Sequence, residues 1–398
     1  MKNTLRFIGK TLWYMLLILI GMLVMFYLMA PVYKFSEPVA FHGSKLYNPY
    51  RDMNPDYWHR YNFQVQSKVW WGITNGRKNS NELIDSIYNV LGFDYVATSD
   101  YQQINYHGSG KPSFIPTYEH GYNLFKTHQV CIGARRVLWI DLILFQTTSM
   151  KQWIIDQLDK DCEIVVLAHP KLRDGYTLED LKKLTRYRFM EVLNSAIISM
   201  KHWDTALSSG QMVWILGDDD AHDVMNSNEV GRTFTVINSP TLNREDIINS
   251  LKSGKAYGVD FYPKRDVPLK ERIERIKQVP VVKSVKLSGD TLFVSIDQKA
   301  GIINFVGQGG ALRKAVRDTS SATYVIRRDD TYVRVEFRFS DGTAIYLNPI
   351  IRYEGEKPVS LLKAEVNKTA TLNLRVIYFL IFLSFAFLFA RKNKKKNL

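Results

Sequence analysis

Two stretches decide the fold. Residues 163–170 are EIVVLAHP and residues 213–222 are VWILGDDDAH. Each is a short apolar run that ends in histidine or aspartate side chains, which can bind metals or transfer protons. Helical patterns lie between such runs, as over 80–91, where apolar residues recur at helical spacing until Gly92. Strands that alternate with helices predict an α/β sheet or barrel, and such folds gather polar side chains at the carboxyl ends of their strands.

The alternation of strands and helices has clear limits along the chain. It covers residues 61–258, and a charged connector over 259–279 follows it. Residues 280–355 contain period-2 runs joined by Gly-containing turns, which predicts a small antiparallel β-sandwich. Two polar linkers, 34–60 and 356–372, flank these regions.

Two apolar segments lie outside the linkers. Residues 11–33 carry no charge and are long enough to cross a bilayer as a first transmembrane helix. A cleaved signal peptide is the alternative, but the run is long and no small-x-small cleavage site follows it. Residues 373–390 form the second predicted span, which is short and relies on Arg375 snorkelling to the interface.

The positive charge is concentrated at the two ends of the chain. The formal net charge is +14, of which the tips 1–10 and 391–398 hold eight charges and no acid. The middle of the chain is therefore only mildly basic, and no nucleic-acid partner is expected. Because cytoplasmic flanks are enriched in Lys and Arg, both termini are predicted in the cytoplasm of a bacterial cell, with the main domains in the periplasm. The expected partners are the lipid bilayer of the inner membrane and a membrane protein.

The polar residues at strand ends follow one another in a particular order. Residues 99–101 are Ser-Asp-Tyr, Glu119 and His128 come next, His169 precedes a proline, and residues 220–222 are Asp-Ala-His. In this order, residues 61–258 resemble the PHP (polymerase and histidinol phosphatase) superfamily of metallohydrolases. The resemblance implies a distorted β/α barrel with up to three metal ions. The C-terminal strands also resemble the sandwich of some members, through Tyr332-Val333-Arg334 and Asn348-Pro349.

The sequence departs from the family at four ligand positions. Gln64, Gln66, Trp71 and Tyr101 stand where the family has His, His, Asp and His. An amide oxygen is a neutral and poorer ligand than an imidazole, and the indole of Trp71 is expected to fill the space of the missing carboxylate. The resemblance therefore implies that two of the three metal positions are incomplete.

The remaining metal position is complete in this sequence. As the resemblance implies, it uses Glu119, His128 and His169, and two imidazoles with one carboxylate suit Zn²⁺ or Mn²⁺. The resemblance also implies that Asp100 orients the metal-ligating residues without contacting the metal itself. Two alternatives stay open, one bound divalent metal or none, because His169 and His222 are equally compatible with hydrogen-bonded core histidines.

Several other side chains have weaker claims to a role. Asp218 and Asp219 are expected to be solvated or bonded to local backbone, while Cys131 and Cys162 are expected to be buried free thiols, with a disulfide as the alternative. Arginines that either bind an anion or form surface salt bridges are Arg135, Arg136, Arg173 and Arg232.

Two functions from different classes follow. The preferred hypothesis is a membrane-anchored, non-catalytic binding or scaffolding module of a membrane complex, because half of the family's metal arrangement is missing. The alternative is a single-metal hydrolase of a phosphoester or related bond outside the cytoplasm, with Asp220 or His222 assisting proton transfer.

The predicted topology can be tested with reporter fusions to the full chain. A reporter that is active only in the periplasm should be active when fused after Ala30 and inactive at the C-terminus, because both basic tips are predicted to be cytoplasmic. A reporter that is active only in the cytoplasm should give the opposite pattern. Activity of the periplasmic reporter at the C-terminus would contradict two spans.

Overall fold

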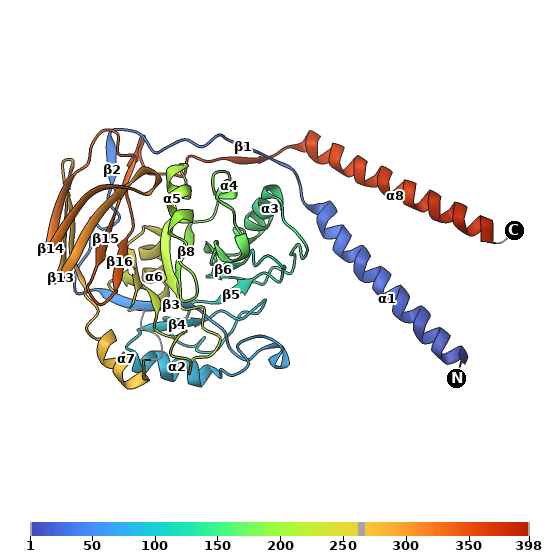
Figure 1. The fold of residues 1–398 in the computed structure, drawn as a ribbon, viewed down its shortest axis with the longest axis horizontal. Helices are drawn as coiled ribbons and strands as arrows, with labels where there is room; N and C mark the ends of the chain where they lie inside the picture. The colour runs from blue at the N-terminus through green and yellow to red at the C-terminus, as the bar shows by residue number, and fades with distance from the viewer. Residues whose placement is uncertain (1, 262–266, 397–398) are drawn as a thin grey trace.

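The computed structural model describes residues 2–261 and 267–396 (Figure 1). Residues 262–266 of the predicted connector, residue 1 of the first tip and residues 397–398 of the last tip lie outside the described residues. A globular body holds most of the chain, and two long helices project from one side of it.

A ring of paired strands forms the centre of the α/β region. One sheet has the order β5-β6-β7-β8-β9, and β3 and β4 pair in parallel at the end of a second sheet of 11 strands. Single bridges join the two sheets. Tyr101, which follows β4, pairs with Glu119 in β5, and Ala221, which follows β9, pairs with Val65 at the end of β3. The bounds are β3 Trp58–Val65, β4 Tyr95–Thr98, β5 Thr117–His120, β6 Gln129–Ile132, β7 Ile164–Leu167, β8 Phe189–Asn194 and β9 Trp214–Asp218.

Helices alternate with these strands, and the α/β class is confirmed. Ser80 caps the first of them by accepting a hydrogen bond from the Leu83 amide at 3.2 Å, and Thr177 forms the predicted capping box with Asp180. The bounds are α2 Asn81–Val90, α3 Thr148–Leu158, α4 Leu178–Leu181, α5 Met200–Ser208 and α6 Arg244–Lys252. The core between strands and helices includes Cys131 and Cys162, which are both buried and free, as the free-thiol interpretation predicted.

The C-terminal strands continue the larger sheet of the α/β region. β16 pairs antiparallel with β11, β11 with β10, and β10 with β3, so hydrogen bonding crosses the predicted domain boundary. The strands over 280–355 are antiparallel as expected, but they do not form a sheet of their own, because β16 satisfies the open edge of β11. The bounds are β10 Thr233–Asn238, β11 Ala256–Asp260, α7 Leu269–Ile276, β12 Val282–Ser288, β13 Thr291–Gly307, β14 Ala311–Val325, β15 Tyr332–Arg338, β16 Ala344–Leu347 and β17 Ile350–Tyr353.

Both predicted linkers contain strands. β1 (Tyr33–Phe35) in the first pairs antiparallel with β18 (Ala364–Val366) in the second, and β2 (Lys45–Tyr47) pairs with β17. Helix α1 (Lys2–Met29) precedes β1 and helix α8 (Lys368–Lys396) follows β18, so the pairing holds the bases of the two projecting helices together (Figure 1).

The first predicted span, 11–33, ends earlier than expected. Helix α1 stops at Met29, because Pro31 disfavours helical backbone in the residue before it. Tyr33 instead belongs to β1, where its hydroxyl donates to Asp156 Oδ2 at 2.7 Å. Among the described residues, the segment Arg6–Met29 is the one helix long and apolar enough to cross a bilayer. The second span, 373–390, lies within α8 and stays a prediction.

Tyr50 and Asn348 join three parts of the chain inside the core. The fully buried Tyr50 hydroxyl donates to the Ala256 carbonyl and accepts from the Asn348 amide, both at 2.7 Å. The Asn348 side chain donates to the carbonyls of Gly254 and Ala256, at 3.0 and 2.9 Å, and accepts from the Ile215 amide at 2.8 Å. One asparagine therefore satisfies buried backbone groups in β9 and at the start of β11.

Replacing this asparagine should be costly. The variant Asn348→Ala leaves the buried Ile215 N–H without this partner, and an unsatisfied group costs about 1–3 kcal/mol. It also removes the hydrogen bonds to the Gly254 and Ala256 carbonyls, each worth about 0.5–1.5 kcal/mol. We expect the free energy of unfolding of the full chain, measured by chemical denaturation in detergent, to fall by about 3 kcal/mol or more. The control Asn89→Ala, at an exposed position on α2, should change it by less than about 0.5 kcal/mol. Equal losses in the two variants would contradict this role.

Candidate metal centre

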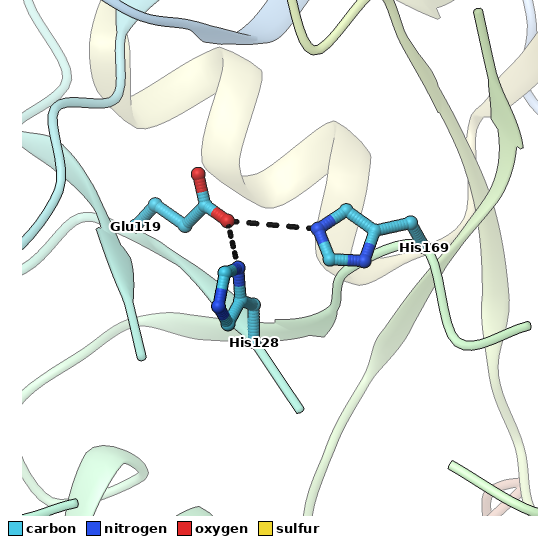
Figure 2. A group of neighbouring side chains, drawn as sticks. All are labelled: Glu119, His128 and His169. Carbon is cyan, nitrogen blue, oxygen red and sulfur yellow. Dashed lines mark hydrogen bonds and ion pairs between the residues drawn. The ribbon is translucent and has the colours of Figure 1, made fainter. Parts of the chain in front are cut away.

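Three neighbouring strands bring Glu119, His128 and His169 together (Figure 2). Glu119 lies in β5, His128 immediately precedes β6, and His169 follows β7 and precedes Pro170. The loop between Glu119 and His128 needs Gly121, whose φ is +126° and where an added Cβ would lie 2.5 Å from His128 Cδ2. The predicted set is therefore a cluster in the folded chain.

The three side chains are close to one another and shielded from water. Glu119 Oε1 lies 2.5 Å from His128 Nδ1 and 3.6 Å from His169 Nε2 (Figure 2). One ligand atom from each residue lies within 4.8 Å of the other two. The relative exposures of the three residues are 0%, 1% and 2%. A single carboxylate oxygen thus faces both imidazoles.

Burial and charge act in opposite directions on this cluster. Burial raises the pKa of Glu119, but the charges of and hydrogen bonds from His128 and His169 outweigh it and hold that pKa well below its ordinary value. Burial lowers the pKa of His128, and Glu119 offsets this only in part. Burial also lowers the pKa of His169, but the hydrogen bond to Glu119 and the charge of Asp220 raise it above its usual value. Glu119 is therefore ionised and available as an anionic ligand.

The donor set fits a divalent cation. His128 Nε2 and His169 Nδ1 are buried and make no hydrogen bond within the described residues. Two imidazoles and one carboxylate match the ligands of Zn²⁺ sites that keep an open position, and Mn²⁺ accepts the same atoms. When bound there, such an ion lowers the pKa of water and polarises an oxygen ligand.

Gln64 and Gln66 are both fully buried, and Gln66 contacts the cluster. Gln66 Nε2 donates to Glu119 Oε2 at 2.6 Å, so it engages the oxygen that the histidines leave free. Both amide atoms of Gln64 are buried and without a hydrogen-bond partner in the described part of the chain. Gln66 therefore orients the Glu119 carboxylate, whereas the Gln64 amide makes no hydrogen bond within the described residues.

The turn after β3 directs Trp71 away from the cluster. Trp70 and Trp71 have φ values of +50° and +54° in the 3-10 turn η1 (Trp70–Gly72), and Trp71 is 93% exposed. Trp70 points inward instead, and its indole N–H donates to the Tyr101 carbonyl at 2.8 Å. The expectation that Trp71 fills the space of a missing carboxylate is therefore wrong, because the left-handed turn directs its side chain into solvent.

Tyr101 lies between the cluster and His222. Its ring meets the His128 ring edge-on with centroids 5.8 Å apart, and its hydroxyl lies 3.4 Å from His222 Nε2. His222 Nε2 is also 3.9 Å from Asp220 Oδ1, which is buried and without a hydrogen-bond partner among the described residues. Burial raises the pKa of Asp220, and the charge of His222 opposes this. The structure thus places the two predicted proton-transfer residues next to each other, with Tyr101 alongside.

Asp100 supports the site through its backbone. Its carboxylate accepts from the Ser67 amide at 2.7 Å, the Ser67 hydroxyl at 2.8 Å and Asn105 Nδ2 at 2.8 Å, and touches none of the three clustered side chains. Its carbonyl accepts from the Glu119 amide at 3.1 Å. Burial raises the pKa of Asp100, opposed by the bonds from Ser67 and Asn105. Asp100 therefore fixes the backbone of Glu119.

Sequence reasoning missed the role of Glu191. This fully buried side chain in β8 accepts from the His169 amide at 2.6 Å and from Asn194 Nδ2 at 2.9 Å. Asn194 also donates to Asp220 Oδ2 at 3.2 Å, so Glu191 and Asn194 link the metal centre to Asp220. Burial, and next the charges of Asp220 and Asp218, raise the pKa of Glu191. An acid inside the otherwise apolar strand FMEVLN was the available signal.

The weaker candidates have structural roles. Asp219 accepts from the Gly231, Arg232 and Thr233 amides and Asp218 from the Phe63 amide. Both carboxylates therefore bond to backbone, but to that of other segments and not to local backbone, and the expectation that they are solvated is wrong. Both carboxylates are buried, and burial raises the pKa of Asp219 to about 6. Three of the candidate arginines make contacts at the exposed surface. Arg135 and Arg136 pair with Asp161, and Arg173 donates to the Leu124 carbonyl.

Comparisons with known proteins leave the family open. No family model matches the chain, and neither does any curated protein. Among solved structures, it is similar to a two-domain protein from Bacteroides vulgatus described as containing a predicted PHP-like metal-dependent phosphoesterase. The TM-score is 0.38 and the identity 11%, over 81% of this chain and 100% of that one.

A metal ion that binds this cluster should stabilise the fold. We expect excess Zn²⁺ to raise the Tm of the full chain over that with chelator, since binding to the folded state alone contributes about 2.7 kcal/mol at a hundredfold excess over Kd. The variant His169→Ala should lose this shift, whereas His107→Ala, which removes a partly exposed histidine that pairs with Asp85, should keep it. Equal Tm values for the wild type with chelator and with Zn²⁺ or Mn²⁺ would contradict a metal centre.

Proposed function

We propose that the chain is a membrane-anchored protein whose PHP-like barrel binds one divalent cation, and that it acts as a non-catalytic binding or scaffolding module. The observation that carries this proposal is the asymmetry of the site. Glu119, His128 and His169 are gathered and shielded from water, while Gln64 and Gln66 stand at the adjacent ligand positions. One cation position is complete and its neighbour has lost its imidazoles.

The hydrogen bond from Gln66 supports a single ion. In the family, the resemblance implies that the carboxylate of Glu119 also serves a second metal held by the two histidines at positions 64 and 66. Here Gln66 donates to Glu119 Oε2 at 2.6 Å, so that oxygen accepts a hydrogen bond. A side chain amide that donates at this point is incompatible with a cation in the same place.

The loss of a second ion weakens the case for catalysis. Phosphoryl chemistry develops negative charge on oxygens, and preorganised positive groups must compensate it. Removing one such contribution typically costs about 3 kcal/mol or more, on the order of a hundredfold in rate. Weak or absent turnover is therefore expected for a site with one ion.

Asp220 and His222 keep the hydrolase hypothesis as a second candidate. Asp220 Oδ1 is buried without a hydrogen-bond partner in the described residues, and His222 is partly exposed beside it at 3.9 Å. This pair can accept a proton from a water and pass it to solvent. A phosphoester or related bond outside the cytoplasm would be the substrate.

The anchoring part of the proposal rests on α1 and on the charge pattern. Arg6–Met29 is long and apolar enough to span a bilayer, and the body of the protein begins directly after it. We infer two spans, cytoplasmic termini and a periplasmic body at the bacterial inner membrane, with the lipid bilayer and a membrane protein as partners.

Restoring the two imidazoles tests the single-ion proposal. The variant Gln64→His with Gln66→His should raise the bound metal from about one to about two ions per chain, measured by equilibrium dialysis with elemental analysis. The matched control Gln103→His with Gln298→His, at two exposed positions, should leave the metal content unchanged. Trp71→Asp is omitted because that side chain points into solvent.

The same preparations test the absence of catalysis. The unmodified full chain should turn over simple phosphomonoesters and phosphodiesters weakly or not at all in the presence of Zn²⁺ or Mn²⁺. Robust, metal-dependent turnover that Glu119→Gln abolishes would contradict the binding role and establish a single-metal hydrolase.

A further inference from the structure

A cavity opens beside the metal centre. It has a volume of about 430 Å³, and His128 and Tyr101 line its inner end. Trp70, Trp139 and Lys126 are among the other lining residues, so one cation and several aromatic rings face the space. Lys126 Nζ lies 5.8 Å from the centre of the Tyr101 ring. The route from solvent to the His128 end of the cluster therefore passes between aromatic side chains.

Large exposed apolar side chains lie on the loops that line this cavity or contact its lining residues. We call them the apolar rim: Trp71, Ile73, Leu124, Phe125, Trp139 and Leu144. Their exposed fractions run from 50% for Phe125 to 93% for Trp71. Six large apolar groups on the loops around one cavity form a patch of the kind that marks a contact with a membrane or another protein.

Direct contacts connect the loops of the rim. The rings of Trp70 and Trp139 meet edge-on at 5.9 Å, which joins the loop after β3 to the loop after β6. The Tyr122 hydroxyl donates to the Trp139 carbonyl at 2.7 Å, and the Leu124 amide donates to the Ile143 carbonyl at 2.9 Å. The rim is therefore one continuous surface.

The apolar rim is joined to the end of the candidate span. The ring of Tyr27 in α1 packs on Phe145 with centroids 4.9 Å apart, and its hydroxyl accepts from the Leu144 and Phe145 amides at 2.9 and 3.1 Å. Tyr27 is two residues before the end of α1 at Met29, about 3 Å along the helix axis. A span that ends there places Leu144 at the depth where tyrosine and tryptophan side chains border the hydrocarbon.

The charge around the opening suits a membrane surface. Residues 66–78 contain no acid; Lys68 and Arg77 are exposed there, whereas Lys78 pairs with Asp223. Lys126 lines the cavity itself. Basic side chains next to a bilayer are attracted to anionic lipids. Apolar side chains and cations on the same loops are the combination that peripheral membrane contacts use.

We propose that the apolar rim rests on the lipid bilayer and that the cavity of the metal centre opens into the headgroup layer, where it takes the anionic phosphoester headgroup of a membrane lipid. The assignment of the lipid ligand rests on the binding role proposed above for the metal centre, whereas the proposed contact with the bilayer does not. The contact follows from the position of the rim beside the end of α1.

Depth-dependent fluorescence quenching tests the bilayer contact. The variants Leu124→Cys, Leu144→Cys and Leu312→Cys of the full chain are each labelled with an environment-sensitive dye, while Cys131 and Cys162 are buried and remain unlabelled. Leu312 is 60% exposed on β14, on the far side of the body from α1 (Figure 1), and serves as the control. In nanodiscs of phosphatidylcholine with brominated acyl chains, the labels at 124 and 144 should be quenched by the lipid. The label at 312 should be quenched by aqueous iodide instead.

Two outcomes overturn the contact. Iodide quenching at 124 and 144 equal to that at 312 places the rim in water. Shielding of both labels from lipid and from iodide shows that another protein or a second copy of the chain covers the rim. The variant Ile73→Cys, on a separate loop, repeats the measurement in case a label at 124 or 144 disturbs the fold.

A second measurement tests the ligand. The Tm of the Zn²⁺-loaded full chain is compared in nanodiscs of phosphatidylcholine with and without phosphatidylglycerol, and in phosphatidylcholine nanodiscs with inorganic phosphate added. We expect phosphatidylglycerol to raise the Tm, Lys126→Gln to abolish the rise, and Lys299→Gln, at an exposed position in β13, to keep it. Stabilisation by free phosphate alone, or none by phosphatidylglycerol, overturns the lipid ligand. The Zn²⁺-dependent Tm shift in detergent reports separately on the metal centre.

Discussion

The buried carboxylate of Glu119 is the constraint on which the rest of the site depends. A carboxylate with no exposure is costly unless charge and hydrogen bonds compensate it. His128 and His169 face one of its oxygens and Gln66 donates to the other. These partners come from loops and strands far apart in the sequence, so the ring of strands must close correctly for Glu119 to be satisfied. The metal centre and the fold are therefore coupled.

Backbone strain gathers around the same group. Trp70, Trp71, His169 and Asp220 all have positive φ, between +29° and +54°, although none of them is glycine. Such conformations cost on the order of 1–3 kcal/mol each and persist where the surroundings fix them. Glu191 does so for His169 by accepting its backbone N–H. Of these four, Trp70 also lines the cavity, as do Gln102 and Lys126, whose φ values are +52° and +58°. Strain at these positions supports the interpretation of the region as a ligand site.

Much of the site could be predicted because strand ends converge in α/β folds. Apolar runs ending in polar residues located His169, Asp220 and His222, whereas Glu119 and His128 were assigned only through the resemblance to the PHP superfamily. Ser80 and Thr177 marked helix starts correctly. Features decided by tertiary contacts were missed. The direction of Trp71 depends on a left-handed turn that residue type does not reveal, and the end of α1 depends on Pro31 and on the pairing of β1. The merging of the C-terminal strands into the larger sheet depends on the edge of β11, which no local pattern records.

The pairing of β1 with β18 has a consequence for how the protein is made. Tyr33 and Val366 are partners although more than 300 residues separate them. A ribosome therefore releases the N-terminal helix and β1 long before their partner strand exists, and a three-residue strand without a partner is not stable alone. The first helix stays attached to an incomplete body until β18 has emerged. Arg375, which donates to the Leu28 and Met29 carbonyls, arrives later still. A chain truncated shortly before β18 would keep Glu119, His128 and His169 and lose the junction that orients the body relative to α1.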